Sequence, residues 1–244
     1  MQKCGAERRR IHFKTTDVNP MTADFVRPRL MLATTLLADG APGREALSRA
    51  LAGGDVASVI LDPAGRSDTA YQAFAEGLVP LIQEAGAAAI VVDDTRCAGR
   101  VRADGIHVTG GDIEALGEAI ARFSPKAIVG TSGFHTRHEA LEAGERMPDY
   151  LLFGPIGGED DAARPADIDL ASWWAAIVEV PAVLSGGGAL EALPAAAASG
   201  AEFILLSRAV FGGEGREGEA VAEANALFDA LERINAIADA SPGF

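Results

Sequence analysis

The residues best suited to binding a ligand lie near the C-terminal end of the chain, where glycines and a serine follow apolar segments. Gly186, Gly187 and Gly188 come directly after the apolar run at residues 181–185, and Ser207 ends the next apolar run. Glycine N–H groups at the start of a helix bind anions, and the loops after the last two strands of a parallel barrel often hold phosphates. We therefore predict a phosphate site here, although a tight turn with close helix packing would use the same residues.

Two aspartates form a second candidate site. Asp94 and Asp112 follow two consecutive apolar runs, so the end of a parallel sheet would bring their carboxylates to one edge. Mg²⁺ favours one or two carboxylates together with water and phosphate oxygens. The pair predicts a Mg²⁺ site near the phosphate. An alternative stays open, in which each aspartate caps the helix that follows it.

Three histidines have different surroundings. His107 lies within an apolar run, which favours a hydrogen-bonded histidine in the core. His135 stands at the start of a helical segment, where it is either an acid/base at the mouth of the site or a capping or surface residue. His138, less than one turn later, is expected to be solvated. Cys97 is interpreted as a packing residue in a short helical turn.

These residues need a scaffold that gathers the ends of many strands. Eight near-continuous apolar runs alternate with segments whose apolar residues recur about every 3.6 positions. This pattern predicts an α/β fold, a single (β/α)₈ TIM barrel, with a doubly wound open sheet as the alternative. We place the barrel at residues 22–244 and expect residues 1–21 to be a short disordered tail. The predicted strands are 29–35, 56–61, 87–92, 104–108, 126–131, 149–154, 181–185 and 203–207.

The composition restricts the classes of partner. The 244-residue chain carries a formal net charge of −14, which argues against nucleic acid or an anionic membrane because both would repel it. No apolar run approaches the roughly 20 residues of a spanning helix. The two cysteines indicate neither a disulfide framework nor a thiolate metal site, which fits a cytoplasmic protein. Assembly as a homodimer is left open.

Several motifs, in order along residues 29–215, resemble those of one enzyme family. They include RADGIHVTGGD, IVGTSGFHTRHEALEA, DYLLFGPIGG and PAVLSGGG followed by AEFILLSRAVF. They are similar to segments of thiamine phosphate synthases and of the related thiazole tautomerases, both of which are (β/α)₈ barrels. The resemblance implies a transferase of thiamine biosynthesis. Such an enzyme couples hydroxymethylpyrimidine diphosphate to thiazole phosphate with the help of Mg²⁺ and releases diphosphate.

The same resemblance implies roles for individual residues. Asp94 and Asp112 correspond to the Mg²⁺-binding aspartates, and Ser132 corresponds to a serine that contacts the substrate. The glycines after the seventh predicted strand, with the backbone around Ser207, correspond to a cradle for the thiazole phosphate. His135 stands where the tautomerase branch has a histidine that transfers protons.

Two stretches depart from the family pattern. After the second predicted strand the family carries Gln, Arg and Lys for the diphosphate, whereas this chain has Asp62, with Arg66 as the only nearby cation. The loop after the sixth strand carries Glu159, Asp160 and Asp161 in place of Thr and Lys. A like-charged pair near 4 Å costs about 1–4 kcal/mol in a solvated site. A thiazole tautomerase-like enzyme and a non-catalytic, phosphate-ligand-binding or regulatory barrel are therefore alternatives.

Overall fold

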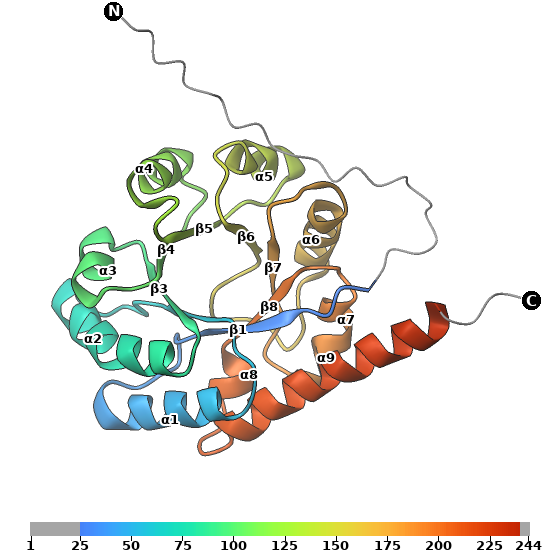
Figure 1. Cartoon of the computed structure of the whole chain (residues 1–244), viewed down its shortest axis with the longest axis horizontal. Helices are drawn as coiled ribbons and strands as arrows, with labels where there is room; N and C mark the ends of the chain where they lie inside the picture. The colour runs from blue at the N-terminus through green and yellow to red at the C-terminus, as the bar shows by residue number, and fades with distance from the viewer. Residues whose placement is uncertain (1–24, 240–244) are drawn as a thin grey trace, which may run out of the picture.

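The chain folds into a closed barrel of eight parallel strands surrounded by helices, as the computed structural model in Figure 1 shows. The structure describes residues 25–239. Each strand pairs with the next along the chain, and β8 pairs with β1 to close the ring. The strands are β1 (Arg29–Ala33), β2 (Ser58–Leu61), β3 (Ala88–Val92), β4 (Gly105–Val108), β5 (Ile128–Ser132), β6 (Tyr150–Phe153), β7 (Ala182–Ser185) and β8 (Phe203–Leu206).

The predicted TIM barrel is confirmed, and the open-sheet alternative is wrong because β1 and β8 are hydrogen-bonded neighbours. Both faces of the strands are buried, which explains why the sequence shows continuous apolar runs instead of alternation. Alternate residues of the strands fill the inside of the barrel. This inner cluster consists of Met31, Ala33, Ile60, Ile90, Val92, Tyr150, Leu152, Val183 and Leu205.

The helices lie outside the ring and bury their apolar faces against the outer side of the strands. Trp174 illustrates this packing, because it is fully buried and its indole N–H donates to the carbonyl of Val180 at 2.7 Å. The helices are α1 (Gly40–Ala52), α2 (Asp68–Glu84), α3 (Thr95–Val101), α4 (Ile113–Phe123), α5 (Arg137–Gly144), α6 (Pro165–Ile177), η1 (Leu190–Ala192), α7 (Leu193–Ala197), α8 (Arg208–Phe211) and α9 (Glu217–Asp239).

The helical segment after β7 is not one continuous helix. It divides into a 3₁₀ turn, η1, and a short α7, with Pro194 in the first turn of α7. Proline has no N–H to donate and suits a helix start, so the chain begins a new helix at this point. The glycine turn before η1 lies against the loop after β6, because the N–H of Gly188 donates to the carbonyl of Asp160 at 2.8 Å.

The long C-terminal helix α9 packs along α1, as Figure 1 shows, and an ion pair between Arg49 and Glu217 at 2.8 Å joins the two. Between residues 25 and 239, no helix is long and apolar enough to cross a bilayer. The predicted disordered tail at residues 1–21 lies outside the described residues. The barrel boundaries at 22–244 therefore stay a prediction.

Candidate active site

The carboxyl ends of all eight strands meet at one rim of the barrel, and most of the predicted site residues follow a strand end there. Asp94 and Asp112 lie after the paired strands β3 and β4. Each caps the next helix. Oδ1 of Asp94 accepts from the N–H groups of Arg96 and Cys97, and Oδ1 of Asp112 accepts from Ala115 N–H at 2.9 Å.

Asp93, the residue before Asp94, holds the two loops together. Its carboxylate accepts from both the N–H and the hydroxyl of Thr109, in the loop after β4; the bond from N–H is 2.9 Å long. Asp93 has a φ of 54°, an uncommon conformation for a residue with a side chain. The hydrogen bonds between the two loops hold Asp93 in this conformation, and they fix the position of Asp94, the N-cap of α3.

Capping and metal binding are compatible at these two aspartates. In the described part of the chain, the hydrogen bonds of both side chains go to Oδ1 alone, so Oδ2 of Asp94 and of Asp112 stays available. The described residues contain no group of three or more His, Cys, Asp or Glu side chains arranged to hold a metal. Binding of Mg²⁺ by one or two carboxylates, with water and substrate oxygens as its other ligands, does not require such a group.

Ser132, at the end of β5, belongs to a buried hydrogen-bonded chain inside the barrel. Its Oγ lies 2.8 Å from Nε2 of His107, and Nδ1 of His107 lies 2.8 Å from the hydroxyl of Tyr150. His107 is fully buried, and desolvation lowers its pKa from 6.5 to about 3. The predicted core role of His107 is confirmed. As a neutral ring it has one donor and one acceptor nitrogen, so it orients the Ser132 hydroxyl.

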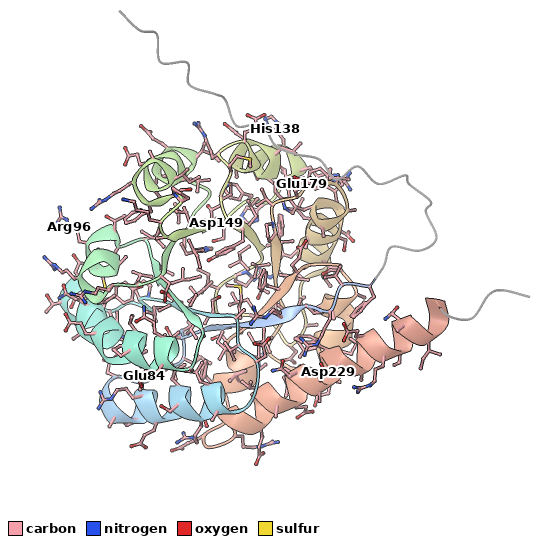
Figure 2. All side chains as sticks on the ribbon, viewed as in Figure 1. Glu84, Arg96, His138, Asp149, Glu179 and Asp229 are labelled. Carbon is pink, nitrogen blue, oxygen red and sulfur yellow. The ribbon has the colours of Figure 1, made fainter. Side chains whose placement is uncertain are left out.

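The other two histidines of the described residues stand at the start of α5. His135 is exposed, and its backbone N–H donates to the carboxylate of Glu139, which closes a capping box with Thr136 at the start of α5. The imidazole of His135 is thus accessible while its backbone is fixed. His138 is exposed on the outer side of α5, away from the strands, as expected (Figure 2).

Four backbone N–H groups lie at the predicted phosphate site, and we call them the anion cradle: those of Gly188 and Ala189 after β7, and of Ser207 and Arg208 after β8. All four already donate to the loop after β6. Oε1 of Glu159 accepts from Ser207 at 3.0 Å and from Arg208 at 2.8 Å. The carbonyl of Asp160 accepts from Gly188, and that of Asp161 accepts from Ala189.

The loop at residues 157–163, which we call the β6 loop, therefore covers the ends of β7 and β8. A side chain at Gly157 would overlap Thr35, so the loop also touches the end of β1. Gly187 has a φ of +91°, and a Cβ there would lie 2.7 Å from the backbone of residues 161 and 162. Because Gly187 has no side chain, the backbone of the β6 loop can approach it closely. An anion cradle and a tight turn would both require this close approach.

Glu159 is a rim residue whose position the sequence does not indicate. Its acidic loop departs from the family pattern, but nothing in the local sequence shows that this carboxylate reaches a strand end 48 residues away. Glu159 is only 8% exposed although it is charged, and carboxylates are rarely buried without such partners.

The polar residues after β2 do not replace the missing diphosphate ligands. Asp62 accepts from the hydroxyl of Thr35 at 2.8 Å and from the N–H of Ala64, so its carboxylate stabilises its own turn. Arg66 pairs with Asp39 at 2.7 Å and stacks over the ring of Phe74. These contacts occupy the guanidinium of Arg66, and they involve neither Asp94 nor Asp112.

Asp167, in the first turn of α6, is a further titratable group at the same rim. One of its carboxylate oxygens, Oδ2, is buried without a hydrogen-bond partner in the described residues. Desolvation raises the pKa of this carboxyl, while Arg164 and His135 act in the opposite direction. It lines a small cavity together with Glu159, Ser185 and Gly187.

Comparison with known proteins places the chain in a family. Residues 31–210 match the family described as Thiamine monophosphate synthase. The thiamine-phosphate synthase of Hyphomonas neptunium is 31% identical over 212 residues, which cover 84% of this chain and 96% of that protein. That of Rhodospirillum centenum is 34% identical over 199 residues, covering 81% and 96%.

Among solved structures, thiamine phosphate pyrophosphorylase from Pyrococcus furiosus has a similar fold, with a TM-score of 0.68 and 23% identity over 84% of this chain and 97% of that one. A 3-hexulose-6-phosphate synthase has a TM-score of 0.59 at 16% identity, over 81% and 98% of the two chains. These structures agree on the barrel, and the sequence matches confirm the resemblance on which the predicted site residues depend. The chain belongs to the thiamine monophosphate synthase family.

Proposed function

We propose that this chain is an enzyme of thiamine biosynthesis that couples hydroxymethylpyrimidine diphosphate to thiazole phosphate and releases diphosphate. The observation that carries this proposal is the family match over residues 31–210, with relatives that are named thiamine-phosphate synthases. The paired strands β3 and β4, which deliver Asp94 and Asp112 to one rim, supply a site of suitable chemistry.

Mg²⁺ is the proposed cofactor, and Oδ2 of Asp94 and of Asp112 would hold it. When bound there, it supplies charge neutralisation for the diphosphate group. Each aspartate is already oriented by backbone N–H groups at its helix start. The bonds between Asp93 and Thr109 keep the two loops in register. Because Arg66 is tied to Asp39, the Mg²⁺ that Asp94 and Asp112 would hold is the counter-charge that we propose for the diphosphate.

Ser132 is the proposed contact for the organic part of a substrate. The neutral His107 engages one side of its hydroxyl and leaves the remaining donor or acceptor capacity for a ligand. Tyr150 lies at the inner end of this hydrogen-bonded chain. Burial raises the pKa of its hydroxyl, so it stays a neutral phenol. The serine is therefore presented in a fixed orientation at the floor of the rim.

The substrates that follow from this proposal are small phosphorylated thiazole and pyrimidine compounds. The cytoplasmic location and the homodimer remain predictions, and so do the individual site residues. The direct test is an assay of the purified chain with both substrates and Mg²⁺, following thiamine phosphate and diphosphate in parallel. We expect the two products in equal amounts. Absence of thiamine phosphate above the background without enzyme would reject the proposal.

A thiazole tautomerase-like activity is the second candidate, because the diphosphate ligands after β2 are missing while the His135 imidazole is exposed at the rim. In this reading His135 moves a proton on the thiazole and Asp94 and Asp112 only cap their helices. Isomerisation of a thiazole carboxylate phosphate would be followed without Mg²⁺. The His135→Ala variant should abolish it, and an unchanged rate would exclude His135 from that role.

A further inference from the structure

The anion cradle is occupied by a carboxylate of the chain itself, that of Glu159. Oε1 of Glu159 accepts two backbone N–H groups, from Ser207 at 3.0 Å and Arg208 at 2.8 Å. Two converging N–H groups at a strand-to-helix turn are the arrangement that binds a phosphate oxygen. The buried carboxylate thus takes the position that a substrate phosphate oxygen would take.

A second carboxylate of the β6 loop pairs with Arg208, a cationic side chain that borders the cradle. Arg208 Nη2 lies 2.6 Å from Oδ1 of Asp161. A side chain at Gly188 would overlap the guanidinium, so Arg208 lies directly against the glycine turn. Arginine binds phosphate and carboxylate oxygens in the same geometry. Glu159 and Asp161 together therefore satisfy the groups that a phosphate would use.

Ser207 shows that the carboxylate is an incomplete substitute. The residue is 1% exposed, and its Oγ is one of two buried side-chain atoms without a hydrogen-bond partner between residues 25 and 239. A buried hydroxyl without a partner is costly, and native structures rarely leave one. Glu159 supplies a single oxygen to the two N–H groups beside this hydroxyl. A phosphate has three terminal oxygens, enough to reach the hydroxyl as well.

The four N–H groups of the cradle are all occupied by the β6 loop. A small cavity beside this loop, lined by Glu159, Ser185 and Gly187 and by none of the four cradle residues, measures about 10 Å³. That volume holds no more than one water molecule. A phosphate ligand must therefore displace the Glu159 carboxylate, together with the loop carbonyls that accept from Gly188 and Ala189.

We propose that Glu159 is an internal competitor for the phosphate of the substrate and sets the affinity of this chain for phosphorylated ligands. The carboxylate closes the anion cradle in the free protein, and binding of a phosphate monoester requires it to leave. The apparent affinity equals the intrinsic affinity multiplied by the fraction of molecules in which the loop is open. The identity of the phosphorylated ligand rests on the proposed function, whereas the competition itself does not.

Inorganic phosphate is the probe that tests the competition. Wild type, Glu159→Ala and Glu159→Gln would be titrated by calorimetry, and the amide signals of Ser207 and Arg208 would be followed by NMR. Glu159→Ala should bind phosphate about tenfold tighter or more, because two charge-assisted bonds no longer compete. Glu159→Gln, which keeps the size but not the charge, should lie between it and wild type.

Glu191→Ala is the matched control, because Glu191 is an exposed acid in η1, just after the glycine turn. The same change of charge there should alter the phosphate affinity less than about threefold, since exposed charges are screened. Unchanged or weaker phosphate binding in both Glu159 variants would overturn the inference. So would equal gains in Glu191→Ala and Glu159→Ala, because general repulsion would then explain both. If Glu159→Ala does not fold, the Glu159→Gln titration decides alone.

The coupling assay separates this inference from the proposed function. With thiazole phosphate as the varied substrate, Glu159→Ala should lower KM by about the same factor as the phosphate dissociation constant. If neither wild type nor variant forms thiamine phosphate while Glu159→Ala gains phosphate affinity, the proposed function fails and the competition stands. If wild type turns over and KM is unaffected by Glu159→Ala, the competition fails and the function stands.

Discussion

Nε2 of His107 lies 2.8 Å from Oγ of Ser132, and both atoms are buried at the inner floor of the candidate site. Because the ring carries no charge at neutral pH, this contact orients the serine without placing a cation inside the barrel. A neutral imidazole also adds no attraction for phosphate. The charged groups of the candidate site therefore lie at the rim, on the two aspartates and on the β6 loop.

The buried His107 should make the free energy of unfolding depend on pH. Its folded pKa is lowered to about 3, so the unfolded chain binds a proton near pH 6.5 that the folded chain does not. Stability is fully present above pH 6.5 and should decrease by about 1.4 kcal/mol per pH unit well below it. Urea unfolding of wild type and of His107→Gln between pH 7 and 5 measures this. The variant should lose that slope.

The control for this experiment is His138→Gln, because His138 is exposed on the outer side of α5. It should keep the wild-type slope. A slope that is unchanged in His107→Gln would mean that other groups produce the pH dependence.

Removal of the Ser132 hydroxyl should reduce coupling more than folding. Ser132→Ala leaves one nitrogen of the buried His107 without its partner, at a cost of about 1–3 kcal/mol of stability. If the hydroxyl also contacts the substrate, kcat/KM should fall a further 10- to 100-fold in protein that remains folded. Steady-state kinetics on Ser132→Ala and on the exposed control Ser48→Ala compare the two effects. A kcat/KM equal to that of the control would remove Ser132 from the site.

The Mg²⁺ role of the aspartates can be separated from their capping role. Asparagine is as good an N-cap as aspartate, so Asp94→Asn and Asp112→Asn should fold normally. Each should raise the Mg²⁺ concentration for half-maximal activity by about tenfold or more, because a neutral amide replaces an anionic ligand.

Asp68→Asn, at the exposed first turn of α2, changes the charge of a helix start on the same rim and should leave the Mg²⁺ dependence unchanged. Magnesium titrations of the three variants, monitored by activity and by thermal unfolding, make the comparison. Identical Mg²⁺ dependence in all three would leave Asp94 and Asp112 as helix caps only.

Gly187 should be intolerant of any side chain. A Cβ there would lie 2.7 Å from the backbone of the β6 loop, and the φ of +91° strains residues other than glycine. Gly187→Ala should lower the free energy of unfolding by about 1–3 kcal/mol and expose the loop. Gly213→Ala, where a Cβ meets nothing within 4 Å, should change stability by less than about 1 kcal/mol. Limited proteolysis at the β6 loop and urea unfolding would detect both effects, and equal stability of the two variants would contradict the prediction.

The sequence by itself determined the barrel, because strand and helix periodicity are local properties and eight β/α repeats have few ways to bury their apolar faces. It also favoured the core position of His107 and offered helix capping at Asp94 and Asp112 as the alternative to a Mg²⁺ site, because both features depend on residues a few positions away. Only the tertiary structure decided which groups meet across strands. Pairing of β3 with β4 brings Asp93 to Thr109, and the curvature of the barrel brings Glu159 to Ser207 and Tyr150 to His107. These contacts span 16 to 48 residues, and no local pattern specifies them, because a charged loop residue has the same sequence signature whether it faces solvent or an anion site.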